Sequence, residues 1–339
     1  MALKNHTDIR RSGQYNQAHQ LGEQMLQLAQ SQPDQPLSIL AHFAIGNTSF
    51  LLGEIDQALQ HFDQVASLYD PSTHGTLAIL FGQDPAVTAL SWKSVALWLT
   101  GRPDQAVQTI QAALELARYR DHPFTLAYAL YCATWLYQMR REIEPLQTYS
   151  QELIPLAQAH GFPFWLSVGL IQQAWAIAQS GKITESIAQL EQGITLWRNI
   201  GAHIGEPYYL SILAEVYGTA GRPQQGLQVL AEARAIMDQN GEAWEGALLD
   251  LAEGELYTLQ TPPDHNQAQA CFQHALETSQ RKGMKALALR AALHLNQHWR
   301  ELGENDQAEK VLASIYHDFT EGFDTLDLVT ARQVVEPVQ

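Results

Sequence analysis

A six-residue turn recurs along the chain at a nearly constant interval. Its clearest copy reads GRPDQA at residues 101–106. Related turns start at residues 13, 53, 101, 141, 181, 221, 263 and 303, and the intervals between them are 40, 48, 40, 40, 40, 42 and 40. A fixed period of roughly 20–50 residues is typical of proteins built from stacked repeats. The sequence therefore predicts a solenoid, in which each unit packs on its neighbours and no single central core is needed.

The residues of the turn predict how each unit folds. Glycine at the first place suits the left-handed residue that ends a helix. Proline at the third place suits the first turn of the next helix. Asp, Asn or Thr at the fourth place can cap that helix, and a small sixth residue lets two helices approach closely. Each copy therefore predicts a tight turn between antiparallel helices, although the copies at 141–146 (REIEPL) and 263–268 (PDHNQA) depart from the pattern.

Downstream of each turn, small and large apolar residues follow at helical spacing. Examples are Ala58/Phe62/Val65, Ala106/Ile110/Ala113 and Ala268/Phe272/Ala275. This pattern resembles the tetratricopeptide repeat, with a period of 40 instead of about 34. It is similar to the long-helix variant found in large bacterial signalling proteins. The resemblance predicts an all-α, right-handed superhelical solenoid of about eight antiparallel helix pairs.

Several longer stretches extend the resemblance over nearly the whole chain. They include LYDP at 68–71, GQDP at 82–85, HPFTLA at 122–127 and FTEGFDTLDL at 319–328. Together they resemble the C-terminal repeat region of bacterial proteins in which a class III nucleotidyl cyclase or another signalling domain precedes an AAA/STAND-type ATPase. The resemblance implies a regulatory role. The sequence contains no P-loop and no cyclase domain, so the enzymatic activities do not carry over and we expect no catalytic residues and no cofactor.

The net charge and the cysteine content indicate which partners and which cellular compartment to expect. The 339 residues carry a formal net charge of −16, which argues against nucleic acid and favours neutral, apolar or basic partners. No apolar run approaches the roughly 20 residues of a membrane span. The two cysteines, Cys132 and Cys271, lie inside helical patterns. We therefore expect no disulfide, no membrane partner and a reducing cytoplasm.

The repeat spacing also divides the chain. We expect one solenoid over 1–339, beginning with the end of a helix at 1–12. Residues 70–85 form an irregular insertion, which is either a functional loop or a plug that fills a gap between repeats with Leu77, Leu80 and Phe81. Residues 318–339 form a capping segment, whose short helix runs from Asp324 or Thr325 to Glu336 and covers the open end of the stack.

Positions that face the concave side of such repeats supply the candidate binding residues. These positions recur along the first helix of each pair, and most hold aromatic or apolar residues, while Gln138 and Glu215 are among the polar ones. Aromatic side chains with polar tips make good recognition surfaces. The alternative is that a tightly wound stack buries these rings in its core. The candidate aromatic wall consists of Trp98, Tyr128, Tyr131, Trp135, Trp175 and Tyr208.

Two further patterns point to ordinary surface residues. His294 and His298 have the i, i+4 spacing of metal ligands, but no third ligand is evident, so we expect surface histidines and no metal site. The basic cluster of Arg281, Lys282, Lys285 and Arg290 is typical of a solvated helical face, although it could also meet an acidic partner.

These observations favour a non-catalytic interaction module that binds a peptide or a partner domain, possibly an ATPase or cyclase domain, through its concave face. The alternative is a small-molecule sensor, in which the aromatic wall binds an effector such as an oligosaccharide. Both alternatives use the same six aromatic residues.

Overall fold

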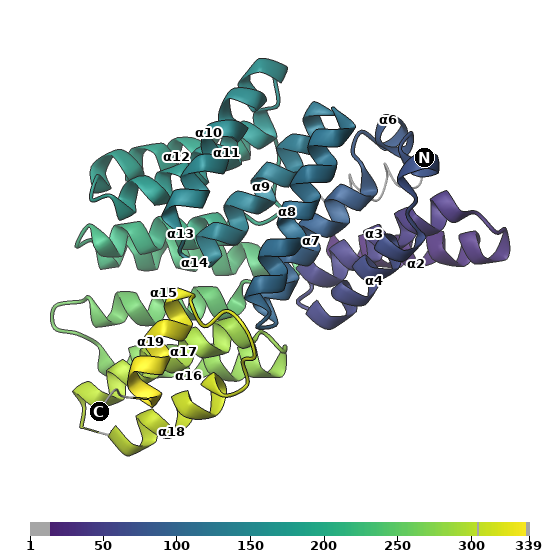
Figure 1. Ribbon diagram of the computed structural model, residues 1–339. Coiled ribbons are helices and arrows are strands. Elements are labelled where there is room, and N and C mark those ends of the chain that lie inside the picture. The colour runs from purple at the N-terminus through teal and green to yellow at the C-terminus, as the bar shows by residue number, and fades with distance from the viewer. Residues whose placement is uncertain (1–13, 304, 337–339) are drawn as a thin grey trace.

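The computed structural model describes residues 14–303 and 305–336, and every regular element in that part of the chain is an α-helix (Figure 1). Nothing is described of residues 1–13, where the first predicted helix and Gly13 fall, or of residues 304 and 337–339. The helices are α2 (Tyr15–Ser31), α3 (Gln35–Leu51), α4 (Ile55–Leu68), α5 (Pro71–His74), α6 (Leu77–Phe81), α7 (Pro85–Leu99), α8 (Pro103–Arg120), α9 (Pro123–Met139), α10 (Ile143–His160), α11 (Pro163–Gln179), α12 (Ile183–Asn199), α13 (Glu206–Thr219), α14 (Pro223–Asn240), α15 (Gly246–Thr258), α16 (His265–Arg281), α17 (Lys285–Glu301), α18 (Asn305–Tyr316) and α19 (Leu326–Val335).

The helices pack as consecutive antiparallel pairs, which confirms the predicted solenoid. The pairs are α3/α4, α7/α8, α9/α10, α11/α12, α13/α14, α15/α16 and α17/α18, each joined by one copy of the repeated turn. Helix α2 is the second helix of the first unit. Figure 1 shows the pairs stacked side by side along a curved path from purple to yellow.

The turns have the backbone geometry that their glycines predict. Gly101, for example, has φ of 82°, a left-handed conformation in which a side chain is unfavourable. The predicted capping role of the fourth turn residue is wrong, because each helix begins two residues earlier. Arg102 is the N-cap of α8 and makes no side-chain cap bond, Pro103 opens the helix, and Asp104 lies in its first turn, where a carboxylate favours the positive end of the helix dipole.

The two helices of a pair differ in how much of their surface they bury. The second helices, such as α4, bury one stripe, formed by Ile55, Ala58, Leu59, Phe62 and Val65. The first helices of the pairs from α3/α4 to α13/α14 are apolar over most of their surface: α9 reads PFTLAYALYCATWLYQM and buries nearly every residue after Leu126. A helix that is apolar on every side is covered on every side. The inner face of this solenoid is therefore largely packed against other parts of the chain.

The superhelix closes because distant repeats meet across its inner face. The loop that follows α14, residues 241–245, lies against the N-terminal helices and is called the closing loop below. Its Ala243 amide donates to the carbonyl of Leu51 at 2.9 Å. The Tyr15 hydroxyl donates to the Glu242 carboxylate at 3.0 Å. These bonds join the second repeat and α2 to the end of the sixth repeat.

The C-terminal end of the chain makes a second closing contact. The Glu321 carboxylate accepts hydrogen bonds from the amides of Asp104 and Gln105 at 2.9 and 3.1 Å, at the N-terminus of α8. Arg290 on α17 donates to the carbonyl of Met139 on α9 at 2.8 Å. In Figure 1 the yellow C-terminal segment accordingly lies beneath the lower ends of α7 and α8.

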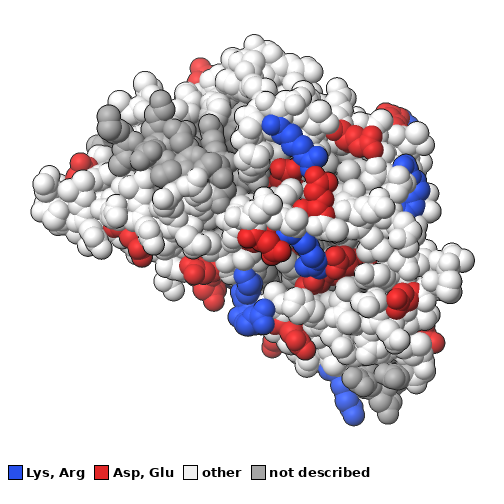
Figure 2. Space-filling model, turned by 180° about the vertical axis from the view of Figure 1, so that it is seen from behind, with Lys and Arg blue, Asp and Glu red and all other residues white. Residues whose placement is uncertain are grey.

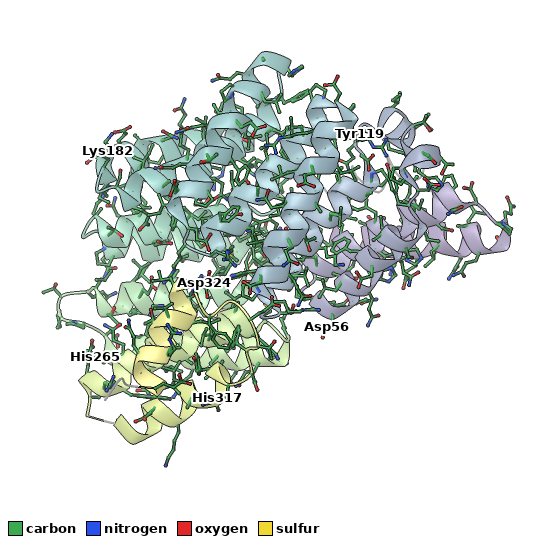
Figure 3. All side chains as sticks on the ribbon, in the orientation of Figure 1. Asp56, Tyr119, Lys182, His265, His317 and Asp324 are labelled. Atoms are coloured by element: carbon green, nitrogen blue, oxygen red, sulfur yellow. The ribbon has the colours of Figure 1, made fainter. Side chains whose placement is uncertain are left out.

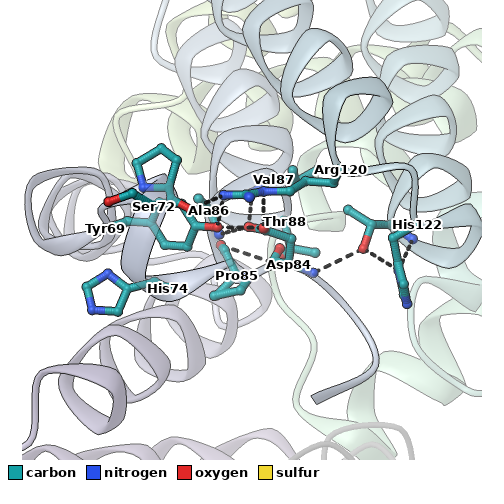
Figure 4. A network of polar contacts seen from close by, with 12 residues as sticks. Tyr69, Ser72, His74, Asp84, Pro85, Ala86, Val87, Thr88, Arg120 and His122 are labelled. Atoms are coloured by element: carbon teal, nitrogen blue, oxygen red, sulfur yellow. Dashed lines mark hydrogen bonds and ion pairs between the residues drawn. The ribbon is translucent and has the colours of Figure 1, made fainter. Parts of the chain in front are cut away.

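The segment 70–85 contains the short helices α5 and α6 and is anchored by a buried carboxylate (Figure 4). Asp84 accepts a hydrogen bond from the Tyr69 hydroxyl at 2.6 Å and pairs with Arg120 at 3.1 Å. Leu77 is buried, as a plug requires, but Leu80 is 72% exposed. Tyr119, beside Arg120, also faces solvent at the edge of the molecule (Figure 3).

Helix α19 packs on α17 and α18 at the end of the stack. Its Asp327 does not face solvent but bonds to Arg290 of α17. On the face shown in Figure 2, acidic and basic side chains lie beside one another between large uncharged areas. Within the described ranges, no helix is long and apolar enough to span a bilayer.

Candidate functional site

The inner face of the superhelix contains two different regions. The first is a cluster of rings called the aromatic centre, formed by Phe50, Trp92, Trp135, Tyr208 and Trp244. The centroid of the Trp135 ring lies 5.7 Å from that of Phe50, 5.4 Å from that of Trp92, 5.8 Å from that of Tyr208 and 5.2 Å from that of Trp244. These residues come from α3, α7, α9, α13 and the closing loop, so the centre exists only because the superhelix closes.

Little space remains beside the aromatic centre. The cavity there, also bordered by Tyr128, Tyr131 and Trp165, has a volume of about 40 Å³. A buried water occupies roughly 10–15 Å³ of such volume, so the cavity has room for a few water molecules. The hydroxyls are bonded within the protein: Tyr208 donates to Gln138 at 2.6 Å.

The six predicted aromatic residues do not form one wall. Five of them expose 2–5% of their surface, and Tyr131 is half-buried. Trp98 packs beneath the Arg290 guanidinium, 5.4 Å from the ring centroid. Trp175 borders a different hollow, described next. The other four, Tyr128, Tyr131, Trp135 and Tyr208, line the small cavity. A binding role for the six stays a prediction.

The second region is a wider hollow at the C-terminal ends of the inner helices. One cavity of about 560 Å³ is lined by Arg141, Trp175 and Glu215, and by the apolar residues Ile143, Leu259 and Leu326. Another of about 580 Å³ lies beyond Arg141 and Leu326 and is lined by Arg290, His294 and Asp327. The two cavities together are called the Arg141 groove. Ile143, Leu259 and Leu326 are 38, 52 and 52% exposed, so the groove has an apolar rim.

Three half-buried carboxylates of the groove differ in their partners, whereas a fourth, Glu301, is exposed and accepts a hydrogen bond from the Gln297 amide at 3.3 Å. Asp327 accepts two hydrogen bonds from Arg290, at 2.7 and 3.0 Å. Glu255 pairs with the His294 imidazole at 2.9 Å. Glu215 accepts one hydrogen bond from the Trp175 indole at 3.2 Å. Among the described residues, no Lys, Arg or His nitrogen lies within 4.0 Å of the Glu215 carboxylate.

Their pKa values follow from these partners. Burial alone would raise the pKa of Glu255 and of Asp327. His294 and Arg141 nevertheless hold the pKa of Glu255 below its ordinary range. Arg290 and Arg141 do the same for the pKa of Asp327. Burial raises the pKa of Glu215, Glu255 raises it further, and Arg141, the Trp175 bond and Arg290 offset these effects only in part. Among the three half-buried groove carboxylates, Glu215 is therefore the one whose charge the protein compensates least.

Arg141 occupies an unusual backbone conformation at the centre of the groove. Its φ is 60°, at the turn position where the equivalent residues are Gly53, Gly101, Gly181 and Gly221. A non-glycine residue in this region costs about 1–2 kcal/mol. Its guanidinium lies 3.6 Å from Asp327. Such strain at a cavity is a reason to examine the residue for a functional role.

Sequence reasoning found part of this groove. The repeat spacing places Glu215 and Gln138 on the concave side of the first helices. The equivalent position of the seventh repeat is Glu255, which the sequence analysis did not include. Two expectations about α17 were wrong. His298 is 2% exposed and so is not a surface histidine, and Arg290 is buried against Asp327 instead of facing solvent. Arg141 could have been found from the missing glycine.

The possible metal ligands and the two cysteines can be judged by the geometry that their chemistry requires. Within the described part of the chain, no three His, Cys, Asp or Glu side chains are arranged to hold a metal ion. Burial raises the pKa of Cys132 well above its usual value, and burial, with the neighbouring Glu253, raises that of Cys271 to about 12. Neither thiol is activated as a nucleophile.

Sequence comparison identifies the repeat. Residues 87–118, which span most of α7/α8, match the family model for the tetratricopeptide repeat. The fold and this match define a solenoid of the tetratricopeptide-repeat type. The chain is 25% identical over 222 residues to an uncharacterized protein of Rhizobium meliloti (strain 1021), an alignment that covers 66% of this chain. The alignment covers 21% of that relative, so the chain spans about a fifth of its length.

Solved structures with the same fold include a Rap protein and a phosphatase. The chain is similar to a Rap protein complexed with the competence and sporulation factor, with a TM-score of 0.61, 11% identity, and coverage of 94% of this chain and 97% of that one. It is also similar to aspartyl phosphate phosphatase F from Bacillus subtilis, with a TM-score of 0.53, 12% identity, and coverage of 88 and 74%. At these identities the similarity shows the fold.

Proposed function

We propose that the chain is a regulatory module that binds a segment of a partner protein in the Arg141 groove. A solenoid of this type is suited to protein–protein interaction or regulation. The Rap protein of the same fold was solved in complex with the competence and sporulation factor. The observation that carries the proposal is the groove itself. It is a cavity of about 560 Å³ rimmed by Ile143, Leu259 and Leu326. Exposed apolar residues gathered round a cavity mark an interaction site.

The aromatic centre is a weaker candidate for the same role. Its cavity of about 40 Å³ leaves no room for a sugar ring or a peptide side chain. An effector such as an oligosaccharide would have to separate the rings that close the superhelix. The resemblance to repeat regions beside cyclase and ATPase domains suggests that the partner segment belongs to such a domain, and this identification is part of the proposal.

A selection of random displayed peptides on the purified chain tests the proposal. Thr219 is exposed and lines the cavity, so Thr219→Trp should fill it. Thr195 is the matched control: it is exposed on α12, and its hydroxyl bonds to the helix backbone as that of Thr219 does. We expect the wild type and Thr195→Trp to enrich the same peptides, and Thr219→Trp to bind them at least about tenfold more weakly. Equal enrichment on Thr219→Trp, or no enrichment at all, contradicts the proposal.

A further inference from the structure

We propose that the segment bound in the Arg141 groove carries a lysine or arginine side chain whose charged end pairs with the Glu215 carboxylate. This inference rests on the proposed function, because it names the chemistry of the ligand for the same groove. Trp175 is a positioning residue in this arrangement, since its indole N–H holds the carboxylate at 3.2 Å.

The first argument is the unequal pairing of the groove carboxylates. Asp327 and Glu255 each have a cationic partner within 3.0 Å. Glu215 borders the same hollow with one neutral donor. A partly buried carboxylate is stabilised by an opposite charge and by further hydrogen bonds. An ammonium or guanidinium group from a ligand supplies both.

The second argument is the order of apolar and charged surface from the rim to the floor. Ile143, Leu259 and Leu326 line the same cavity as Glu215 and are more exposed than its half-buried side chain. Lysine and arginine have the same order along the side chain, an aliphatic stem followed by a cation. The stem would contact the rim, and the cation would reach the carboxylate. A glutamate or aspartate side chain has the wrong charge to pair with Glu215.

Arg141 is poorly placed to bind an anionic ligand instead. The Arg141 guanidinium has Asp327 at 3.6 Å, and Glu215 and Glu255 are close enough to raise its pKa. An anionic ligand at Arg141 would therefore meet three carboxylates. The net charge of −16 also disfavours approach of an anion and attracts a cationic segment. Arg141 thus acts as the internal counter-ion of the groove.

The test uses the peptides enriched on the wild-type chain and a double-mutant cycle. We expect each enriched family to share a lysine or arginine. In fluorescence anisotropy with a dye-labelled peptide, replacing that residue by norleucine should weaken binding about 10- to 100-fold. Glu215→Gln should weaken the parent peptide by a similar factor but leave the norleucine peptide almost unaffected. That coupling shows that the two groups meet.

The control variant is Glu191→Gln. Glu191 also accepts one hydrogen bond from an aromatic side chain, from the Tyr217 hydroxyl at 2.6 Å, but it does not line the groove. It should bind the parent peptide normally. Norleucine substitution leaves the protein unchanged, so the test holds even if Glu215→Gln folds poorly. Peptides that need the groove but lack a cation, or independent effects of the two changes, would overturn the inference and leave the proposed function standing. No enriched peptide would overturn both.

Discussion

The aromatic centre and the Arg141 groove both lie on the inner face of the superhelix and share helix α13, yet one is packed and the other is open. Trp135 on α9 and Tyr208 on α13 meet Phe50 and Trp244 because the N-terminal repeats and the closing loop fold back over them. Farther along α13, Glu215 meets no such cover and lines the groove beside Trp175 of α11. The difference shows that a position on the inner face of a superhelix becomes core or binding surface according to what the chain places opposite it.

The two regions differ in polarity as well as in cover. The aromatic centre combines large rings with two carboxyl groups, Glu242 and Glu245, at the closing loop. The groove keeps ionised pairs such as Arg290 and Asp327 at its wall. Buried rings contribute through apolar area removed from water. Buried ion pairs contribute little net stability, because the cost of removing both charges from water offsets their attraction, and they contribute more to the choice of ligand.

The largest expected effect comes from removing the Trp244 ring, which connects the closing loop to the other rings of the aromatic centre. Trp244→Ala should lower the free energy of unfolding by about 3–5 kcal/mol, because Trp244 is 1% exposed and contacts Phe50, Trp135 and Tyr208. Guanidinium titration measures the loss, and small-angle scattering should show a larger radius. The control Tyr119→Ala removes a ring that is 78% exposed and should cost under about 0.5 kcal/mol. A loss below about 1 kcal/mol for Trp244→Ala would show that closure does not depend on this ring.

A smaller effect should appear as a pH dependence at the closing loop. Burial, and then Glu242, raise the pKa of Glu245 well above its ordinary value of 4.5. The folded protein therefore holds this proton to higher pH than the unfolded chain does, and the free energy of unfolding falls as pH rises above about 4.5. Glu245→Gln removes a charge that the fold opposes, so we expect it to stabilise the protein at about pH 8.

Denaturant titrations from about pH 5 to about pH 8 check this expectation. The advantage of Glu245→Gln over the wild type should shrink toward the acid end. An advantage that is constant over the whole range would mean that the substitution acts through packing and not through the proton.

At the groove, a pair of substitutions separates backbone strain from side-chain contacts. Arg141→Gly and Arg141→Ala both remove the guanidinium, but only glycine suits φ of 60° without cost. The glycine variant should therefore be more stable than the alanine variant by about 1–2 kcal/mol. The same pair at Asp121, with φ of 49° at the end of α8, is the control and should differ in the same direction. Equal stabilities at position 141 would show that the turn relaxes around the side chain.

The smallest effect should occur at the rim of the groove. Leu259→Ala should change the free energy of unfolding by less than about 0.5 kcal/mol, since Leu259 is 52% exposed. Leu249→Ala, in helix α15 just before Leu259, removes a fully buried side chain and should cost about 2–5 kcal/mol. Urea titration distinguishes the two. A large loss for Leu259→Ala would identify the rim as structural and weaken the case for an interaction surface.

Prediction from the sequence succeeded where structure depends on neighbours in the chain. The glycine of each turn and the small residue that follows it, such as Gly101 and Ala106, specified helix pairs and their order. The prediction of caps at the fourth turn residue failed by two positions, because proline at the first helical position settles where α8 begins. The partners of Glu215 could not be predicted, since Trp175 lies a full repeat away and the cationic partners of the other carboxylates lie elsewhere.

The sequence by itself determined that this protein is an all-helical solenoid, because a period of 40 residues repeats the same local turn and the same apolar spacing. It also showed that the inner helices are rich in apolar residues, but it left open whether these residues line a groove or form a core. Only the tertiary structure decided what covers them. The contacts of Tyr15 with Glu242 and of Asp104 with Glu321 span more than 200 residues, and they depend on a small rotation added at every repeat. That accumulated curvature packs Trp135 into the core and leaves Glu215 facing an open groove.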